Sequence, residues 1–157
     1  MSRTVPTYTV AELEYLNDID LVDFGNDEAV RLGRLAVDVI TERDLNLAVD
    51  VVLGDDLVFR AKLKETGPGN DPWLRAKAAA ALGFGEASML VKLRHLEAGT
   101  PFEERDDVDH DVVKAYGGSI PLKVAGVVVG TITASGEADA LDHETVAEAL
   151  ARYLTRS

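Results

Sequence analysis

An aromatic residue and two basic residues stand close together in the middle of the chain. They are Trp73, Arg75 and Lys77. On a helix, Trp73 and Lys77 share one face, because side chains four residues apart are neighbours. The lysine and the arginine could pair with a carboxylate of a bound ligand. The alternative is that Trp73 fills the core or a subunit interface while both cations stay in water.

Glycines form a second group of candidate binding residues. Gly117 and Gly118 come directly before an apolar run, and paired glycines can present backbone N–H groups to an anion or a flat ligand. They can equally serve only to start a strand, because glycine tolerates sharp turns. Ser135 and Gly136 end the same apolar region, shortly before a predicted helix whose N-terminus is another natural place for an anion.

The composition is that of a globular chain with a large negative charge. Its 157 residues are 46% hydrophobic and carry a net charge of -12. This charge repels nucleic-acid backbones and anionic lipids, so neither nucleic acid nor membrane is an expected partner. The absence of cysteine excludes disulfides, thiol catalysis and iron–sulfur clusters. No secretory signal pattern or membrane-length apolar run is present, and the default location is therefore the cytoplasm.

Two hairpins and several helices are predicted around these residues. Apolar residues alternate in 47–53 and 57–63 around a turn at 54–56, and a second hairpin joins 119–125 to 127–135 around Gly126. Helices are predicted at 9–18, at 27–44 after an Asn26 cap, at 73–99 with breaks at Gly83 and Gly85, and at 143–154 after an Asp142 cap. A short strand at 20–24 and a short helix at 112–115 complete the set.

This order of elements predicts an α+β fold in a single domain that spans residues 1–157. Strands in hairpins are antiparallel, and two hairpins can join into one sheet that helices cover. The acidic residues of 103–111 are read as a solvated loop, and a divalent-cation site there is the alternative.

Two sequence blocks resemble one known family. The stretch GGSIPLKVAGVVVGTITASG, followed by LDHETVAEAL, is similar to the C-terminal signature of the haem-degrading domain family of GlcG-like and HbpS-like proteins. The stretch GNDPWLRAKAAAALGFGEAS is similar to a second block in one branch of that family. With NDEAVRLG, the similarity runs from about residue 24 to residue 150.

The resemblance implies a profilin-like fold, with an antiparallel sheet of about five strands and helices on both faces. It also implies a homo-oligomer and makes haem a candidate cofactor. One departure concerns the second block, where Glu86 stands in the position that is often histidine in this branch. Haem ligation or proton transfer through that position is therefore not expected here.

The three histidines are candidate ligands for haem iron or another metal. His143 could bind haem iron, although a solvated residue at a helix N-terminus is the simpler interpretation. His95 on a charged helix face and His110 in an acidic loop are predicted to be exposed. Their scatter lacks the spacing of a zinc site, so no metal site is predicted. No Ser–His–Asp set is evident, and catalytic residues stay unassigned.

The leading hypothesis is non-enzymatic binding of a small anionic or planar ligand, with haem as one candidate. The predicted site combines the start of the 119–125 strand, the loop after the 127–135 strand and the helix that carries Trp73. Its residues are Trp73, Arg75, Lys77, Gly117, Gly118, Ser135, Gly136 and His143. A haem-degrading enzyme and an oligomeric scaffold without ligand are the two alternatives.

Overall fold

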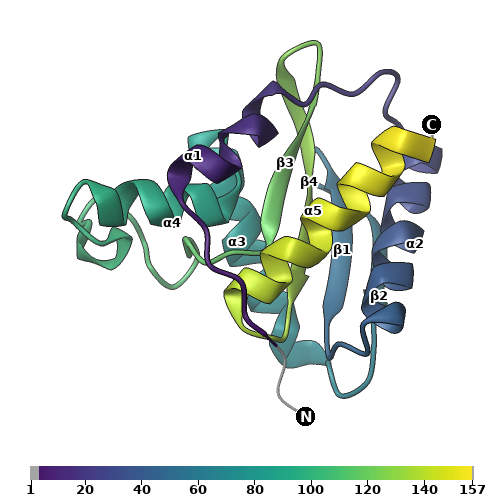
Figure 1. Ribbon diagram of the computed structural model, residues 1–157, viewed down its shortest axis with the longest axis horizontal. Coiled ribbons are helices and arrows are strands. Elements are labelled where there is room, and N and C mark those ends of the chain that lie inside the picture. Colours follow the sequence, from purple (N-terminus) through teal and green to yellow (C-terminus); the bar gives the residue numbers. More distant parts are fainter. Residues whose placement is uncertain (1–3, 157) are drawn as a thin grey trace.

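Residues 4–156 form a four-stranded antiparallel sheet packed between helices in the computed structural model (Figure 1). The strands are β1 (Ala48–Leu53), β2 (Asp56–Lys62), β3 (Ser119–Val124) and β4 (Val127–Ser135), in the order β2-β1-β4-β3. The helices are α1 (Val10–Leu13), α2 (Asn26–Glu42), α3 (Asp71–Phe84), α4 (Ser88–Glu97) and α5 (Asp139–Arg156). Short 3-10 helices occupy Glu14–Asp18, Pro68–Asn70 and Phe102–Glu104.

The α+β class and both predicted hairpins are confirmed, but the expected number of about five strands is too high. The segment 20–24 does not form a strand. Leu21 alone makes a single parallel bridge to Val124, and its N–H donates to the Lys123 carbonyl at 2.7 Å. Asp23 then takes a φ of +48°, which ends the extended conformation.

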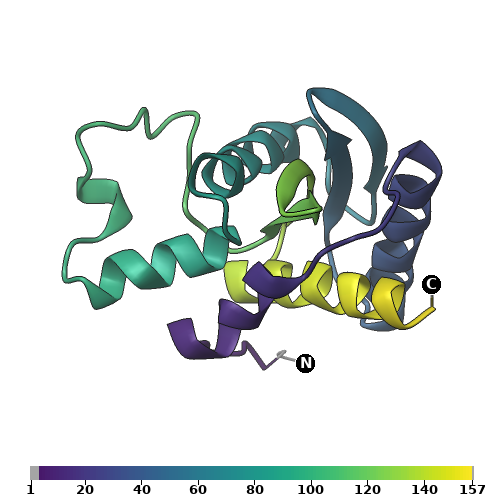
Figure 2. The same cartoon turned by 90° about the horizontal axis from the view of Figure 1, so that it is seen from above.

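Helices cover both faces of the sheet, as predicted (Figure 2). α2 and α5 pack against each other and against one face, and α3 covers the other. Side chains alternate along β1, since Val49 and Val51 enter the main apolar core while Asp50 turns toward α3. Gly33 lets α2 approach β2 closely, because a Cβ there would lie 2.2 Å from the Phe59 ring.

The sheet face under α3 is unusually polar for a buried surface. Buried polar residues on this face are Asp50, Ser119, Thr131, Thr133 and Ser135. Such groups are stable in a core only when they find hydrogen-bond partners or bind water or a ligand. This face therefore carries polar groups that a bound ligand could contact.

Two predicted helix starts differ from the structure. α2 begins one residue earlier than expected, because Gly25 rather than Asn26 is the N-cap and its N–H donates to Glu28 Oε1 at 2.8 Å. α5 begins at Asp139, so Asp142 lies in its first turn instead of preceding it. From this position Asp142 accepts a hydrogen bond from the Glu137 N–H and also reaches Lys77 on α3.

The segment between α3 and β3 also differs in detail. The break at Gly85 is confirmed, since its φ of +67° ends α3, but Gly83 lies inside the helix. The prediction of a short helix at 112–115 is wrong. The helical turn of this segment lies earlier, where Phe102–Glu104 forms a 3-10 helix. α4 and the chain after it project from the sheet as an arm (Figure 1), with a small apolar cluster of Val91, Phe102 and Ala115.

No helix within residues 4–156 is long and apolar enough to cross a bilayer.

Candidate functional site

A cavity of about 510 Å³ lies where α3 and α5 begin, next to the end of β4. We call it the Trp73 cavity. Its lining residues come from four separate segments and are Gly69, Asn70, Trp73, Lys77, Tyr116, Ser135, Gly136, Glu137, Asp139 and Asp142. The volume is in the range of small-molecule sites in proteins.

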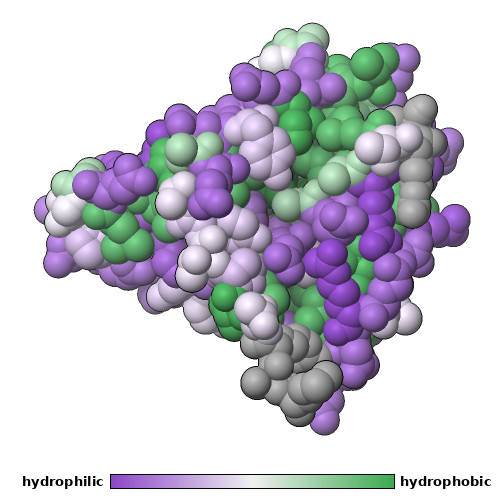
Figure 3. Space-filling model, in the orientation of Figure 1, coloured by the Kyte–Doolittle hydropathy of each residue, from purple (hydrophilic) through white to green (hydrophobic). Residues whose placement is uncertain are grey.

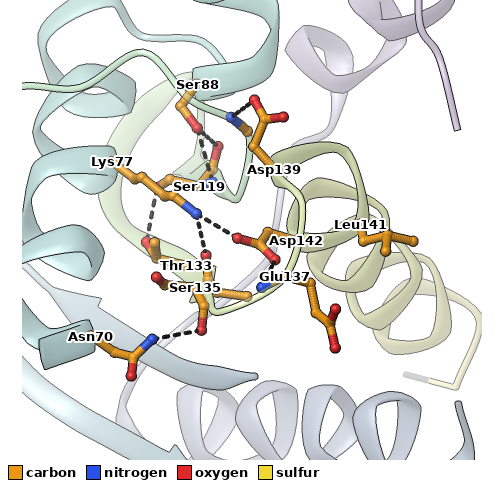
Figure 4. A network of polar contacts seen from close by, with 12 residues as sticks. Asn70, Lys77, Ser88, Ser119, Thr133, Ser135, Glu137, Asp139, Leu141 and Asp142 are labelled. Atoms are coloured by element: carbon orange, nitrogen blue, oxygen red, sulfur yellow. Dashed lines mark hydrogen bonds and ion pairs between the residues drawn. The ribbon is translucent and has the colours of Figure 1, made fainter. Parts of the chain in front are cut away.

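A buried ion pair forms one wall of the Trp73 cavity (Figure 4). Lys77 Nζ lies 2.6 Å from Asp142 Oδ2 and also donates to the Ala134 carbonyl at 3.0 Å. The two side chains are only 4% and 1% exposed. Burial raises the pKa of Asp142 to about 6, although the Lys77 ammonium acts to lower it. The pair ties α3 to α5 and places charge beside the cavity.

Two backbone N–H groups beside the cavity already have acceptors within the chain. Asp142 Oδ1 accepts from the Glu137 N–H at 3.0 Å, and Asp139 Oδ2 accepts from the Gly117 N–H at 3.0 Å. Burial disfavours ionised Asp139, but hydrogen bonds from Lys92 and Gly117 outweigh it and hold its pKa below the usual value. The carboxylates of Asp139 and Asp142 therefore use two backbone donors that a bound anion would otherwise contact.

Two aromatic rings, those of Trp73 and Tyr116, form another part of the lining. Trp73 is 40% exposed, and its ring meets that of Tyr116 edge to face at 5.7 Å. The Lys114 ammonium lies 5.2 Å from the Trp73 ring centre, and the Lys92 ammonium lies 5.2 Å from that of Tyr116. An exposed tryptophan in a concave site is a surface on which a planar ligand can stack.

Hydrogen bonds fix the surroundings of the cavity (Figure 4). Asn70 Nδ2 donates to the Ser135 carbonyl at 3.2 Å, which holds the start of α3 against the end of β4. Deeper in, the Ser119 and Thr133 hydroxyls lie 2.9 Å apart, and the Ser119 N–H donates to Ser88 Oγ at 3.0 Å. These hydrogen bonds hold the start of α3, the start of β3 and the end of β4 in fixed positions around the cavity.

The structure brings most of the predicted site residues together. Trp73, Lys77, Ser135 and Gly136 line the cavity. Gly117 and Gly118 lie directly beside it, and a Cβ on Gly118 would be 3.0 Å from Lys77 Nζ. The glycines thus permit close packing around the ion pair, and the Gly117 N–H is used within the chain.

Arg75 and His143 are the two predicted residues that lie elsewhere. Arg75 lines a different cavity between α3 and the β1–β2 side of the sheet. His143 lines a third cavity, of about 470 Å³, with Tyr8 and Arg43. The interpretation of His143 as a solvated residue is wrong, because it is 1% exposed under the Tyr8 ring, at 5.1 Å between ring centres.

Burial changes the chemistry of the His143 cavity. It lowers the pKa of His143 to about 4, so the imidazole is neutral at pH 7. Its Nδ1 is buried without a hydrogen-bond partner. Burial also raises the pKa of Tyr8 to about 12, and Glu144 adds to this shift. A neutral imidazole with a free nitrogen can accept a hydrogen bond or bind a metal.

Several lining residues were not predicted as site residues. Asn70 stands inside the block that carries Trp73, and Tyr116 immediately precedes the glycine pair, so proximity in sequence could have indicated both. Asp139 and Asp142 are three residues apart on α5; the sequence predicts Asp142 only as a helix cap and assigns Asp139 no role. Across residues 4–156, no group of three His, Asp or Glu side chains is placed to hold a metal ion.

The fold and cavity define a class: an antiparallel sheet with helices on both faces and a polar and aromatic cavity at one end. The chain belongs to the family described as haem degrading protein HbpS-like, whose model matches residues 24–151. A UPF0303 protein of Streptomyces coelicolor is 43% identical over 155 residues, covering 96% of this chain and 98% of that protein. The predicted family is thus confirmed.

Solved structures support the same fold. Ybr137w superposes with a TM-score of 0.84 at 22% identity, covering 96% of this chain and 90% of that one. A PduOC:heme complex superposes with a TM-score of 0.68 at 17% identity, covering 85% of this chain and 94% of that one. Both blocks that carry the family resemblance contribute to the Trp73 cavity, with Asn70, Trp73 and Lys77 from one and Ser135, Gly136 and Asp142 from the other.

Proposed function

We propose that this protein binds a small planar ligand in the Trp73 cavity and releases it unchanged. The observation that carries the proposal is the convergence of the two family blocks on one cavity with an exposed tryptophan in its wall. The carboxylates of Asp139 and Asp142 already use two backbone donors, so stacking on Trp73 and polar contacts at the edges would provide the affinity. A simple anion fits this lining less well than a flat molecule.

Haem is the leading candidate for this ligand. The family is named for haem degradation, and one protein of similar fold is described as a haem complex. In the Trp73 cavity, the rings of Trp73 and Tyr116 would hold the macrocycle, and Lys92 and Lys114 beside them could pair with its carboxylates. The Tyr116 phenol is of a type that ligates haem iron. Haem, when bound, supplies an iron that can bind oxygen.

The His143 cavity is a rival haem site, favoured by one specific observation. His143 is neutral, as an imidazole that binds a metal must be, its Nδ1 has no hydrogen-bond partner, and Arg43 lines the same cavity. Tyr8 packs across the His143 ring. Haem could therefore reach this imidazole only if the segment that carries Tyr8 moved.

A haemin titration followed by the Soret band tests the proposal. We expect one saturable, shifted band that a Tyr116→Phe variant weakens and a His143→Ala variant leaves intact. If His143→Ala abolishes the band and Tyr116→Phe does not, the site is the His143 cavity. Broadening without saturation, the same in all three proteins, would exclude haem as the ligand.

Haem turnover distinguishes the enzymatic alternative from simple binding. Among the described residues that line the Trp73 cavity there is no histidine or cysteine, and the groups able to move a proton are Lys77, Tyr116 and the carboxylates. A binding protein keeps its Soret band when ascorbate and oxygen are added to the haem complex. Steady loss of the band at a rate above that of free haemin would instead make this protein a haem-degrading enzyme.

The scaffold alternative is favoured by exposed apolar side chains. Figure 3 shows such side chains near the outer end of the β3–β4 hairpin, where Val127 is 64% exposed and Val22 81% exposed. Apolar patches of this kind often mark contacts between subunits. We expect a homo-oligomer, which sedimentation velocity would detect. An oligomer that binds no planar ligand would favour the scaffold role.

A further inference from the structure

A second cavity lies between α3 and the β1–β2 side of the sheet, away from Trp73. Its volume is about 440 Å³, and we call it the Asp50 cavity. Much of its wall is aliphatic, with Val52 and Leu57 from the hairpin and Leu74, Ala78 and Leu82 from α3. No residue that lines the Trp73 cavity lines this one as well.

Unpartnered polar atoms lie on the sheet side of the Asp50 cavity. Asp50 Oδ1, Arg60 Nε and Thr131 Oγ1 are buried without hydrogen-bond partners, and all three residues line the cavity. Asp50 and Thr131 are only 2% and 1% exposed. The strand register places Asp50 opposite Arg60, and Val52, two residues along β1, opposite Thr131. Buried polar groups without partners cost stability unless a water or a ligand satisfies them.

The unpartnered atoms specify what a head group must offer. Asp50 Oδ1 requires a hydrogen-bond donor, and Arg60 Nε requires an acceptor. Thr131 can serve either way. Asp50 Oδ2 already accepts from Arg60 Nη2 at 2.9 Å. Arg60 also pairs with Asp71 at 3.4 Å, and Asp71 pairs with Lys62 at 2.9 Å, so these charges balance within the chain. Burial raises the pKa of Asp50, against the lowering effect of Arg60. A neutral head group that both donates and accepts is therefore the best match.

The outer part of the cavity indicates that the rest of the ligand is an aliphatic chain. Leu57 and Leu82 are 45% and 46% exposed, so an aliphatic chain leaving the head group would cover them and remove apolar surface from water. One ordered water needs only about 30 Å³. A water molecule on the polar atoms would leave most of the aliphatic space unfilled.

We propose that the Asp50 cavity binds a small, uncharged aliphatic molecule whose head group is a primary amide or a chemically similar donor–acceptor group. The head group contacts Asp50, Arg60 and Thr131, and the chain lies along Leu57 and Leu82. This site is independent of the Trp73 cavity and of the ligand proposed for it.

The test uses the full chain, labelled with ¹⁵N, and hexanamide as the probe, with amide chemical shifts as the readout. We expect saturable shifts of residues lining the Asp50 cavity, while Trp73 and Tyr116 stay unchanged. Acetamide, which has the head group without the chain, should bind much more weakly. Thr131→Val keeps the shape but removes the hydroxyl, and should weaken hexanamide binding about 5-fold.

Two further variants keep the test decisive. Ala78→Leu should fill the cavity and abolish binding, while Ala151→Leu on the exposed face of α5 should leave binding intact. The shifts of the remaining amides show that each variant is folded. The proposal is overturned if hexanamide causes no saturable shifts, if Ala78→Leu binds as well as the natural chain, or if acetamide binds as tightly as hexanamide.

Discussion

Lys77 on α3 and Asp142 in the first turn of α5 form an ion pair whose nitrogen and oxygen lie 2.6 Å apart, with both side chains almost fully buried. The two residues are 65 positions apart in the sequence. Because α3 and α5 pack on opposite faces of the sheet, this contact joins the two layers at the sheet's end. It also forms part of the wall of the Trp73 cavity.

Breaking this pair should destabilise the fold. Lys77→Met leaves the Asp142 carboxylate buried without its partner, and Asp142→Asn leaves the Lys77 ammonium without its counter-charge. Removing one member of a buried pair costs about 3–5 kcal/mol. Urea unfolding of each variant would measure the loss.

The double variant is the matched control for the pair. In Lys77→Met with Asp142→Asn, neither charge remains unpaired, so the free energy of unfolding should fall by clearly less than the sum of the two single losses. Strict additivity would mean that the two side chains act separately, contrary to the contact described above.

His143 should make the protein sensitive to acid. Its pKa is lowered to about 4 in the folded chain, against about 6.5 when unfolded. The unfolded chain therefore takes up the proton first as pH falls, and the stabilising effect is complete above pH 6.5 and lost toward pH 4. Relative to a His143→Leu variant, the natural chain should lose about 3 kcal/mol of unfolding free energy over this interval.

The comparison with the variant isolates His143 from Asp142. The pKa of Asp142 is raised to about 6, so its own contribution is present at low pH and is lost as pH rises through about 6. The Asp142 contribution is the same in the natural chain and in His143→Leu, so it cancels when their free energies of unfolding are subtracted. Parallel stability curves between pH 4 and pH 7 would show that His143 is not buried in neutral form.

Gly118 should tolerate no side chain. Its φ is +136°, and a Cβ would lie 2.5 Å from the Ala134 carbonyl oxygen, which itself accepts from Lys77. Gly118→Ala should therefore destabilise the chain by about 3 kcal/mol or more. Gly126→Ala in the hairpin turn is the control, since its φ is +78° and nothing lies within 4 Å of the added Cβ. That change should cost only about 1 kcal/mol, and equal thermal shifts for the two variants would refute the crowding at Gly118.

The hairpins could be predicted from the sequence because alternation and turn residues are local signals. The alternation of Leu47, Val49 and Val51 places one face of β1 in the core, as observed. The segment 20–24 has a similar apolar character but pairs only at Leu21. Whether such a segment becomes a strand depends on neighbours that are distant in the sequence.

The sequence predicts the glycines and Trp73 as site residues, but it does not predict which side chains contact each other. The local sequence predicts Asp142 only as a helix cap, because its contact with Lys77 depends on the packing of both layers. The local sequence likewise predicts a solvated His143. Its burial depends on Tyr8, which reaches it from the N-terminal segment.

The central claim, that the Trp73 cavity binds a planar ligand, is tested most directly by tryptophan fluorescence during a haemin titration. Trp73 is the only tryptophan in the sequence, so the emission comes from this cavity alone, and the variants decide where the quenching haemin is bound. We predict quenching that saturates at one haemin per chain, is weakened by Tyr116→Ala and is unaffected by His143→Ala. Quenching that only grows linearly with haemin, or a saturating Soret band with unchanged emission, would contradict the claim.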